Sequence, residues 1–201
     1  MVIYHERFDL QGANITGIST EVLVEDQFAF LKELLGTVKN VGVIYDPSKT
    51  KNIVSKACLV AKKFELNLIK TEITFNKEVT SALKKIINEI DALWIIPDST
   101  VITRGSLGVI LETALKRHLP TFCTSSAIVR EGAMTSISPD YTDIGLQAAR
   151  IAQRLLNSPK VISLGVKQSD KLKLSLNIQT ANRIGIDISS IQSRPNVVLY
   201  P

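Results

Sequence analysis

The sequence predicts an α/β protein with a parallel sheet flanked by helices, and two observations lead to this fold class. Short, continuously apolar runs alternate with amphipathic helical segments through the middle of the chain. The helical segments are too long for hairpin connections, so the strands form right-handed crossovers with helices on both faces of the sheet. The composition agrees, because 201 residues with 45% hydrophobic side chains can bury a core without disulfides or metal.

The regular part of the pattern begins with a predicted strand at 41–45. This run is apolar and rich in β-branched residues, and it stops at the turn signal Asp46-Pro47-Ser48. Apolar residues then recur at helical spacing over 53–64. The alternation repeats twice more, which predicts strands at 66–74, 92–96 and 120–123 and helices at 79–90 and 107–115.

The regular alternation of strands and helices ends after residue 124. A short strand is expected at 133–138, followed by a strongly amphipathic helix at 143–156 that either Asp140 or Thr142 caps. The polar, alternating segment 161–175 fits a strand or a loop. A short helix at 179–184 should stop at Gly185, and 197–200 is predicted as a last edge strand.

Small polar residues gather where the predicted strands end. In an open parallel sheet, ligands bind beyond the carboxyl ends of the strands, where loops meet helix N-termini. Four segments qualify: 46–52, 98–103, 124–127 and 138–141. The candidate ligand-binding residues are Asp46, Ser48, Asn52, Asp98, Ser99, Thr124, Ser125, Ser138, Asp140 and Tyr141. For each of them the alternative interpretation is a helix cap.

Enzyme signatures are missing from the sequence. It contains no G-x-G-x-x-G, no phosphate loop, no G-x-S-x-G and no H-E-x-x-H. Two cysteines without metal-ligand spacing suggest neither a disulfide framework nor a metal site. We therefore expect no catalytic residues, no metal and no cofactor, and a doubly wound enzyme with an unrecognised motif is the weaker alternative.

Charge argues against nucleic acid. The 24 basic and 19 acidic residues give a formal net charge of +5, but Lys and Arg are scattered and no aromatic residues are interleaved with them. No apolar run approaches the ~20 residues of a membrane helix. Residues 1–7 have neither a basic start nor an apolar centre, so the sequence predicts no secretory signal within this chain.

Several ordered segments resemble one known family. They are Gly12-Ala13-Asn14-Ile15-Thr16-Gly17-Ile18-Ser19, Val41-Gly42-Val43-Ile44-Tyr45-Asp46-Pro47-Ser48, Leu93-Trp94-Ile95-Ile96-Pro97-Asp98, Glu131-Gly132-Ala133 and Ser138-Pro139-Asp140-Tyr141. In this order they resemble the ABC-transporter substrate-binding family related to tryptophan and phenylalanine binders. The resemblance implies a type I periplasmic-binding-protein fold, in which two α/β lobes close on a small solute such as an amino acid.

The resemblance also implies a division of the chain. Residues 1–37 would be a truncated first-lobe remnant with the hinge and an entry helix, 38–136 the second, ligand-binding lobe, and 137–201 the hinge return, a first-lobe helix and a C-terminal segment. In this division the chain would contain few strands of the first lobe, so the apolar stripe of helix 143–156 should be exposed. The other half of a split protein, a second copy in a homodimer, or the second lobe itself would then cover it.

Two functions follow from the resemblance. The first is the substrate-binding component of an ABC transporter, or a truncated form of it, which hands a small solute to a membrane permease and is periplasmic or at the cell surface. The second is an intracellular ligand-sensing or regulatory α/β module without a transport role.

Overall fold

The computed structural model describes residue 10 and residues 12–160 and 162–201, and these fall into two compact units. Unit 1 combines residues up to Val22 with Ser138–Lys173, and unit 2 combines Leu23–Ile137 with Leu174–Pro201. The chain therefore passes between the units three times. The predicted start of the chain at 1–7 lies outside the described residues.

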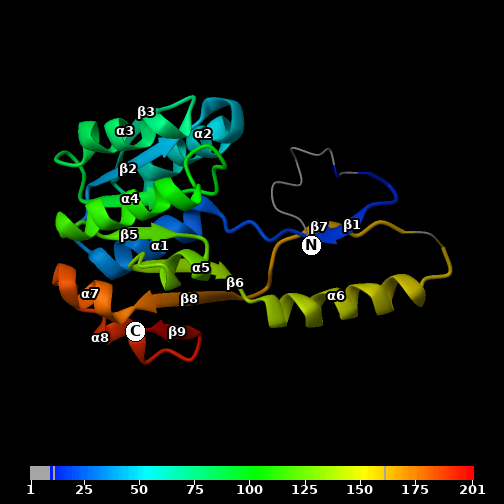
Figure 1. Cartoon of the computed structure of the whole chain (residues 1–201). Coiled ribbons are helices and arrows are strands. Elements are labelled where there is room, and N and C mark those ends of the chain that lie inside the picture. The colour runs from blue at the N-terminus through cyan, green and yellow to red at the C-terminus, as the bar shows by residue number, and fades with distance from the viewer. Residues whose placement is uncertain (1–9, 11, 161) are drawn as a thin grey trace. The chain divides into compact units, whose positions relative to one another are not determined.

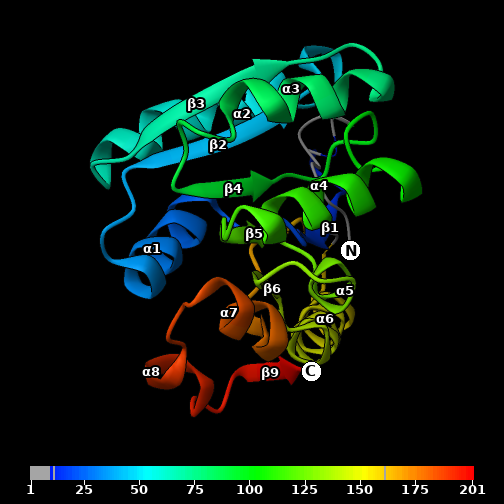
Figure 2. The same cartoon turned by 60° about the vertical axis from the view of Figure 1, so that its left-hand side comes forward.

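Unit 2 contains the large sheet, whose strand order is β3-β2-β4-β5-β6-β8-β9. Its strands are β2 (Asn40–Tyr45), β3 (Asn67–Glu72), β4 (Ala92–Ile95), β5 (Thr121–Cys123), β6 (Thr135–Pro139), β8 (Leu172–Asn177) and β9 (Val197–Tyr200). The helices between them are α1 (Val24–Leu35), α2 (Pro47–Lys63), η2 (Asn76–Glu78), α3 (Val79–Ile86), α4 (Arg104–Lys116), α5 (Ser126–Arg130), α7 (Ile178–Ile184) and α8 (Ser189–Gln192). Figures 1 and 2 show this α/β arrangement.

Helices cover both faces of this sheet, as the apolar strands predict (Figure 2). Val43 and Trp94 point into one core together with α1 and α2, whereas the neighbouring residues Ile44 and Ile95 point into a second core with α3 and α4. Successive side chains of a strand face opposite sides of the sheet, so strands that are apolar at every position need cover on both sides.

The predicted parallel sheet is confirmed from β2 to β6, where β2 pairs with β3 and β4, β4 with β5, and β5 with β6, all in parallel. The sequence pattern makes no prediction of direction for the last two strands. Asn177 N–H donates to Met134 O, whereas Asp140 N–H donates to Lys171 O, so β8 runs opposite to β6. The chain reaches β8 by returning from unit 1 instead of by a helical crossover on the sheet, and β9 then follows β8 in parallel.

Unit 1 is smaller and consists of β1 (Thr16–Ile18), β7 (Gly165–Lys167) and α6 (Tyr141–Leu156), with the beginning of β8 and the end of β6. The strands β1 and β7 form a separate two-stranded parallel sheet. Helix α6 begins two residues before the predicted start, because Asp140 accepts hydrogen bonds from the N–H groups of Thr142 and Asp143. Asp140, and not Thr142, is therefore the cap.

The boundaries of the two compact units differ from those of the predicted divisions, which are 1–37, 38–136 and 137–201. Helix α1 belongs to unit 2, because Phe28 packs edge-on against Trp94 and Phe122 in the core beneath it. Residues 174–201 also return to unit 2, where they add β9 and helices α7 and α8. That the units are the lobes of a closing protein stays a prediction.

Gly42 on β2 is required by close packing. A Cβ atom at this position would lie 2.6 Å from Cδ1 and 3.0 Å from Cγ2 of Ile90. We expect Gly42→Ala to lower the free energy of unfolding by roughly 1 to 3 kcal/mol through overpacking, measured by urea denaturation.

Gly108→Ala is the matched control, because Gly108 lies in α4 with nothing within 4 Å of the added Cβ. This variant should be unchanged or up to about 1 kcal/mol more stable, since alanine favours a helix over glycine. Equal stability of Gly42→Ala and the unmodified chain would contradict the packing argument.

Candidate functional site

Two aspartates connect the loops that follow neighbouring strands of unit 2. Asp46 comes after β2 and Asp98 after β4, and β2 pairs with β4. The backbone N–H of Asp46 donates to Oδ2 of Asp98 at 2.9 Å. In return, the Thr100 hydroxyl of the Asp98 loop donates to Oδ2 of Asp46 at 2.7 Å. We call these reciprocal contacts the Asp46–Asp98 cross-link.

Both carboxylates are also occupied within their own loops. Oδ1 of Asp46 accepts from the N–H and the hydroxyl of Ser48, at 2.8 and 2.7 Å, and so caps α2. Oδ1 of Asp98 accepts from the N–H groups of Thr100 and Val101 at 2.9 and 3.3 Å. The side chains are almost inaccessible, with 5% of Asp46 and 1% of Asp98 exposed. Buried acceptors with this many donors hold the loops in place.

Thr50 is a part of this arrangement that the sequence analysis did not single out. It is buried, its hydroxyl donates to Oδ2 of Asp98 at 2.6 Å, and its backbone leaves helical geometry with φ −131° and ψ 15° inside α2. Thr100 was likewise not named individually. Their segments 46–52 and 98–103 were expected to be polar, but a spacing pattern alone does not show which hydroxyl reaches across to the neighbouring loop.

The other predicted residues of unit 2 are more accessible. Ser48, Asn52 and Ser99 are exposed at or near the ends of β2 and β4, and Thr124 and Ser125 are half-buried after β5. Because β2, β4 and β5 are adjacent and parallel, their loops follow at the same edge of the sheet. We call this set of loops the carboxyl edge of unit 2.

Three predicted residues belong to unit 1. Ser138 is buried, with its hydroxyl 3.5 Å from Lys173 O, and Asp140 caps α6. Tyr141, the first residue of α6, has 60% of its surface exposed.

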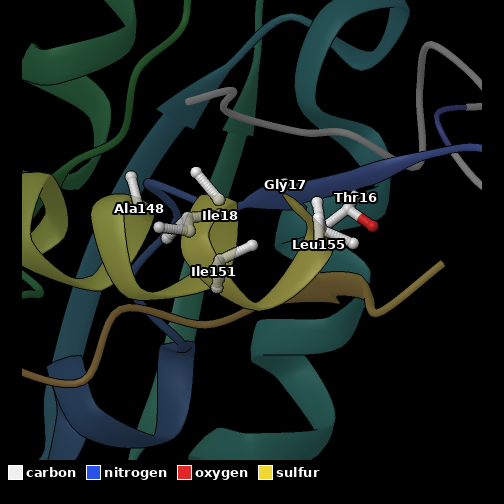
Figure 3. Close-up of a pocket in the computed structure, with 7 residues that line it drawn as sticks. Thr16, Gly17, Ile18, Ala148, Ile151 and Leu155 are labelled. Atoms are coloured by element: carbon white, nitrogen blue, oxygen red, sulfur yellow. The ribbon is translucent and has the colours of Figure 1, made fainter. Parts of the chain in front are cut away.

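The apolar stripe of α6 is largely uncovered, as the sequence predicts. Within the stripe Ile144 is buried, but Leu156 is 86% exposed. A hollow of about 260 Å³ lies between the helix and β1 (Figure 3). Its lining consists of Thr16, Gly17, Ile18, Ala148, Ile151, Ala152 and Leu155.

Two further findings concern metals and membranes. Among the described residues no three His, Cys, Asp or Glu side chains gather closely enough to hold a metal ion. Of the helices that the structure describes, none has the length and apolar character required to span a membrane.

Comparison with solved structures identifies the fold. A conserved domain protein from Vibrio cholerae O1 biovar El Tor superposes with a TM-score of 0.75 at 27% sequence identity, over 94% of this chain and 64% of that one. The ligand-free, open structure of a substrate-binding protein with adhesive properties from Clostridium difficile gives a TM-score of 0.82 at 24% identity, over 95% and 64%. These likenesses show that the chain has the α/β fold of solved substrate-binding proteins.

The sequence comparisons are more specific. The family model described as ABC transporter substrate binding protein matches residues 4–196, and the chain belongs to this family. A tyrosine-binding protein from Clostridioides difficile (strain R20291) is 24% identical over 171 residues, which are 84% of this chain and 49% of that protein. A third solved structure, an ABC domain from Streptococcus pneumoniae in complex with L-Trp, has a TM-score of 0.71 at 23% identity, over 92% and 65%. The chain thus spans about half of this curated relative and about two thirds of these solved structures.

The hydrogen bonds on Asp46 predict a pH dependence of stability. The Thr100 hydroxyl first, and then Ser48, hold the pKa of the Asp46 carboxyl below its ordinary value. A carboxyl with a lowered pKa in the folded state stabilises the fold above its unfolded pKa of about 3.9, and this contribution is lost as the pH falls through the folded value. We expect Thr100→Val to be less stable than the unmodified chain at pH 7, and the difference to shrink below about pH 4.

Urea denaturation from pH 7 to pH 3 measures this effect. Thr113→Val is the control, because Thr113 lies half-buried in α4, away from the carboxyl edge. A stability difference for Thr100→Val that stays constant over the whole pH range would show that Asp46 is not the group involved.

Proposed function

We propose that this chain is the substrate-binding component of an ABC transporter, or a part of that component, and that it binds a small solute such as an amino acid. Membership of the family over residues 4–196 carries the proposal. The carboxyl edge of unit 2 supports it, because the Asp46–Asp98 cross-link fixes two adjacent polar loops before any solute arrives. A membrane permease would be the partner, and the periplasm or the cell surface the location.

The solute site would use the accessible hydroxyl and amide groups of the carboxyl edge. Ser99, Thr124 and Asn52 are able to donate and accept hydrogen bonds, and they follow or flank three adjacent strands. Asp46 and Asp98 would hold these loops without touching the solute, because their oxygens already accept bonds from within the protein. Ser138, Asp140 and Tyr141 remain candidates contributed by unit 1.

A titration of the full chain with amino acids and small organic acids, followed by amide NMR shifts, tests the proposal. We expect shifts at Ser99 and Thr124 in particular, and a roughly fivefold weaker affinity for Thr124→Val, the effect of about 1 kcal/mol from one hydrogen bond. NMR is preferable to fluorescence because Trp94, the only tryptophan, is 2% exposed and is held by Gln27 beneath α1.

Ser55→Ala is the control variant, because Ser55 is exposed on α2 beyond the strand-end loop. It should bind as the unmodified chain does. Unchanged spectra across the whole panel would count against a solute site. A sensory module would bind the same solutes, so transport itself is tested by adding the chain to its permease in vesicles and measuring uptake.

We also propose that protein covers the apolar face of α6 in the working molecule, either a second copy or a polypeptide that supplies the remainder of the first lobe. The exposure of Leu156 and the hollow beside Ile151 support this. Because an exposed apolar face favours association in water, we expect the isolated chain to self-associate at high concentration, as measured by light scattering against the mass of 22.1 kDa. Ile151→Asp should restore the monomer.

Leu59→Asp is the matched control for this experiment, since Leu59 is 68% exposed but lies on α2 of unit 2. It should leave self-association unchanged. A chain that stays monomeric at every concentration would exclude the second copy as the cover.

A further inference from the structure

The carboxyl edge of unit 2 contains carboxylates, but its two buried ones are unavailable to a solute. The four oxygens of Asp46 and Asp98 accept hydrogen bonds from Ser48, Thr50, Thr100 and Val101 and from the backbone of Asp46 itself. With 5% and 1% of these side chains exposed, an approaching ammonium group would have to displace internal donors. Replacing hydrogen bonds within the protein by hydrogen bonds to the ammonium group would change the free energy of binding little.

Two further carboxylates at the end of β3 and in the segment after it each accept hydrogen bonds with one oxygen. Glu72, at the end of the edge strand β3, accepts the Tyr45 hydroxyl at 2.6 Å. Glu78 accepts the N–H groups of Thr74 and Phe75 with one oxygen. The loops after β2, β4 and β5 therefore lack an accessible carboxylate among the residues that the structure describes.

A cation and several hydroxyls are accessible at the same place. Lys49 is exposed in the first turn of α2, which follows β2, near enough that its charge helps to lower the pKa of Asp46. Ser99 is exposed after β4, and Thr124 and Ser125 are half-buried after β5. The first N–H groups of α2 are already used, since Lys49 and Thr50 donate theirs to Asp46 O. An anion would therefore be bound by side chains here and not by the helix N-terminus.

We propose that unit 2 binds its solute through a carboxylate or a comparable oxyanion of that solute, with Lys49 as the charged partner and the hydroxyls of the carboxyl edge as donors. The solute's amino group then contributes little to the affinity. This inference rests on the proposed function, because it assigns a ligand chemistry to the same site. A charge-assisted hydrogen bond to Lys49 is about twice as strong as one to a neutral hydroxyl of the edge.

Three compounds that share one ring test the inference against the full chain: tyrosine, 3-(4-hydroxyphenyl)propanoate, which lacks the amino group, and tyramine, which lacks the carboxylate. Amide NMR titration gives their affinities. We expect the two carboxylates to bind within about threefold of each other and tyramine at least about tenfold more weakly, the effect of one charge-assisted contact. Lys49→Gln should weaken the two carboxylates about tenfold and leave tyramine unchanged.

Lys51→Gln is the matched control, because Lys51 is exposed two residues further along α2 and should have little effect. If tyramine binds as well as tyrosine, or if loss of the amino group abolishes binding, the inference is overturned while the proposed function stands.

Asp143 would then be the group to substitute, because its buried Oδ2 has no hydrogen-bond partner among the described residues although its Oδ1 lies 3.1 Å from Lys171 Nζ. Failure of every compound, including the wider panel, would overturn both proposals.

Discussion

The geometry of the carboxyl edge depends on one interaction, the exchange of hydrogen bonds between the Asp46 and Asp98 loops. Parallel strands bring loops to the same edge of a sheet, but they do not fix how those loops lie with respect to each other. Here a backbone N–H crosses in one direction and a threonine hydroxyl crosses in the other. Because both acceptors are buried carboxylates, breaking either contact leaves a buried polar group without its partner, so separating the two loops is costly.

Thr50 shows how this interaction shapes the local backbone. Its hydroxyl reaches Asp98 only because α2 departs from helical geometry at that residue, with φ −131° and ψ 15°. A nonhelical residue inside a helix costs free energy, and the hydrogen bond to a charged acceptor offsets this cost. The deviation also means that the residues on either side of Thr50, which include Lys49 and Asn52, do not continue on a single helical face.

The fold could be predicted further than the site. Strands that are apolar at successive positions, as β2 is from Val41 onwards and β4 is throughout, have one stable environment, a sheet covered on both faces, and the helical spacing between them requires crossovers. The direction of β8 could not be predicted, because it depends on a return from unit 1 and not on the local pattern. The sequence does not distinguish an aspartate that caps a helix from one that binds a ligand, because both are short side chains that accept hydrogen bonds directly after a strand. What separates them is the set of donors that reach each oxygen, and Thr50 and Thr100 come from different parts of the chain.

The internal hydrogen bonds on the Asp46 and Asp98 carboxylates affect which solutes the carboxyl edge can bind. A hydroxyl donates or accepts with little preference, so an edge made of serine and threonine does not by itself distinguish an anion from a cation. Accessible charged side chains then add to the selection, although they contribute fewer contacts than the hydroxyls do. With the oxygens of Asp46 and Asp98 committed to the protein, the accessible charges at this edge include the ammonium of Lys49, in the first turn of α2, and the guanidinium of Arg104, at the start of α4. The buried acids therefore have two effects, since they order the loops and they keep their own oxygens out of direct contact with a solute, and neither effect is separable from the other by substituting the aspartates. For this reason Lys49, which is exposed and makes no part of the cross-link, is the residue through which recognition can be altered without altering the fold.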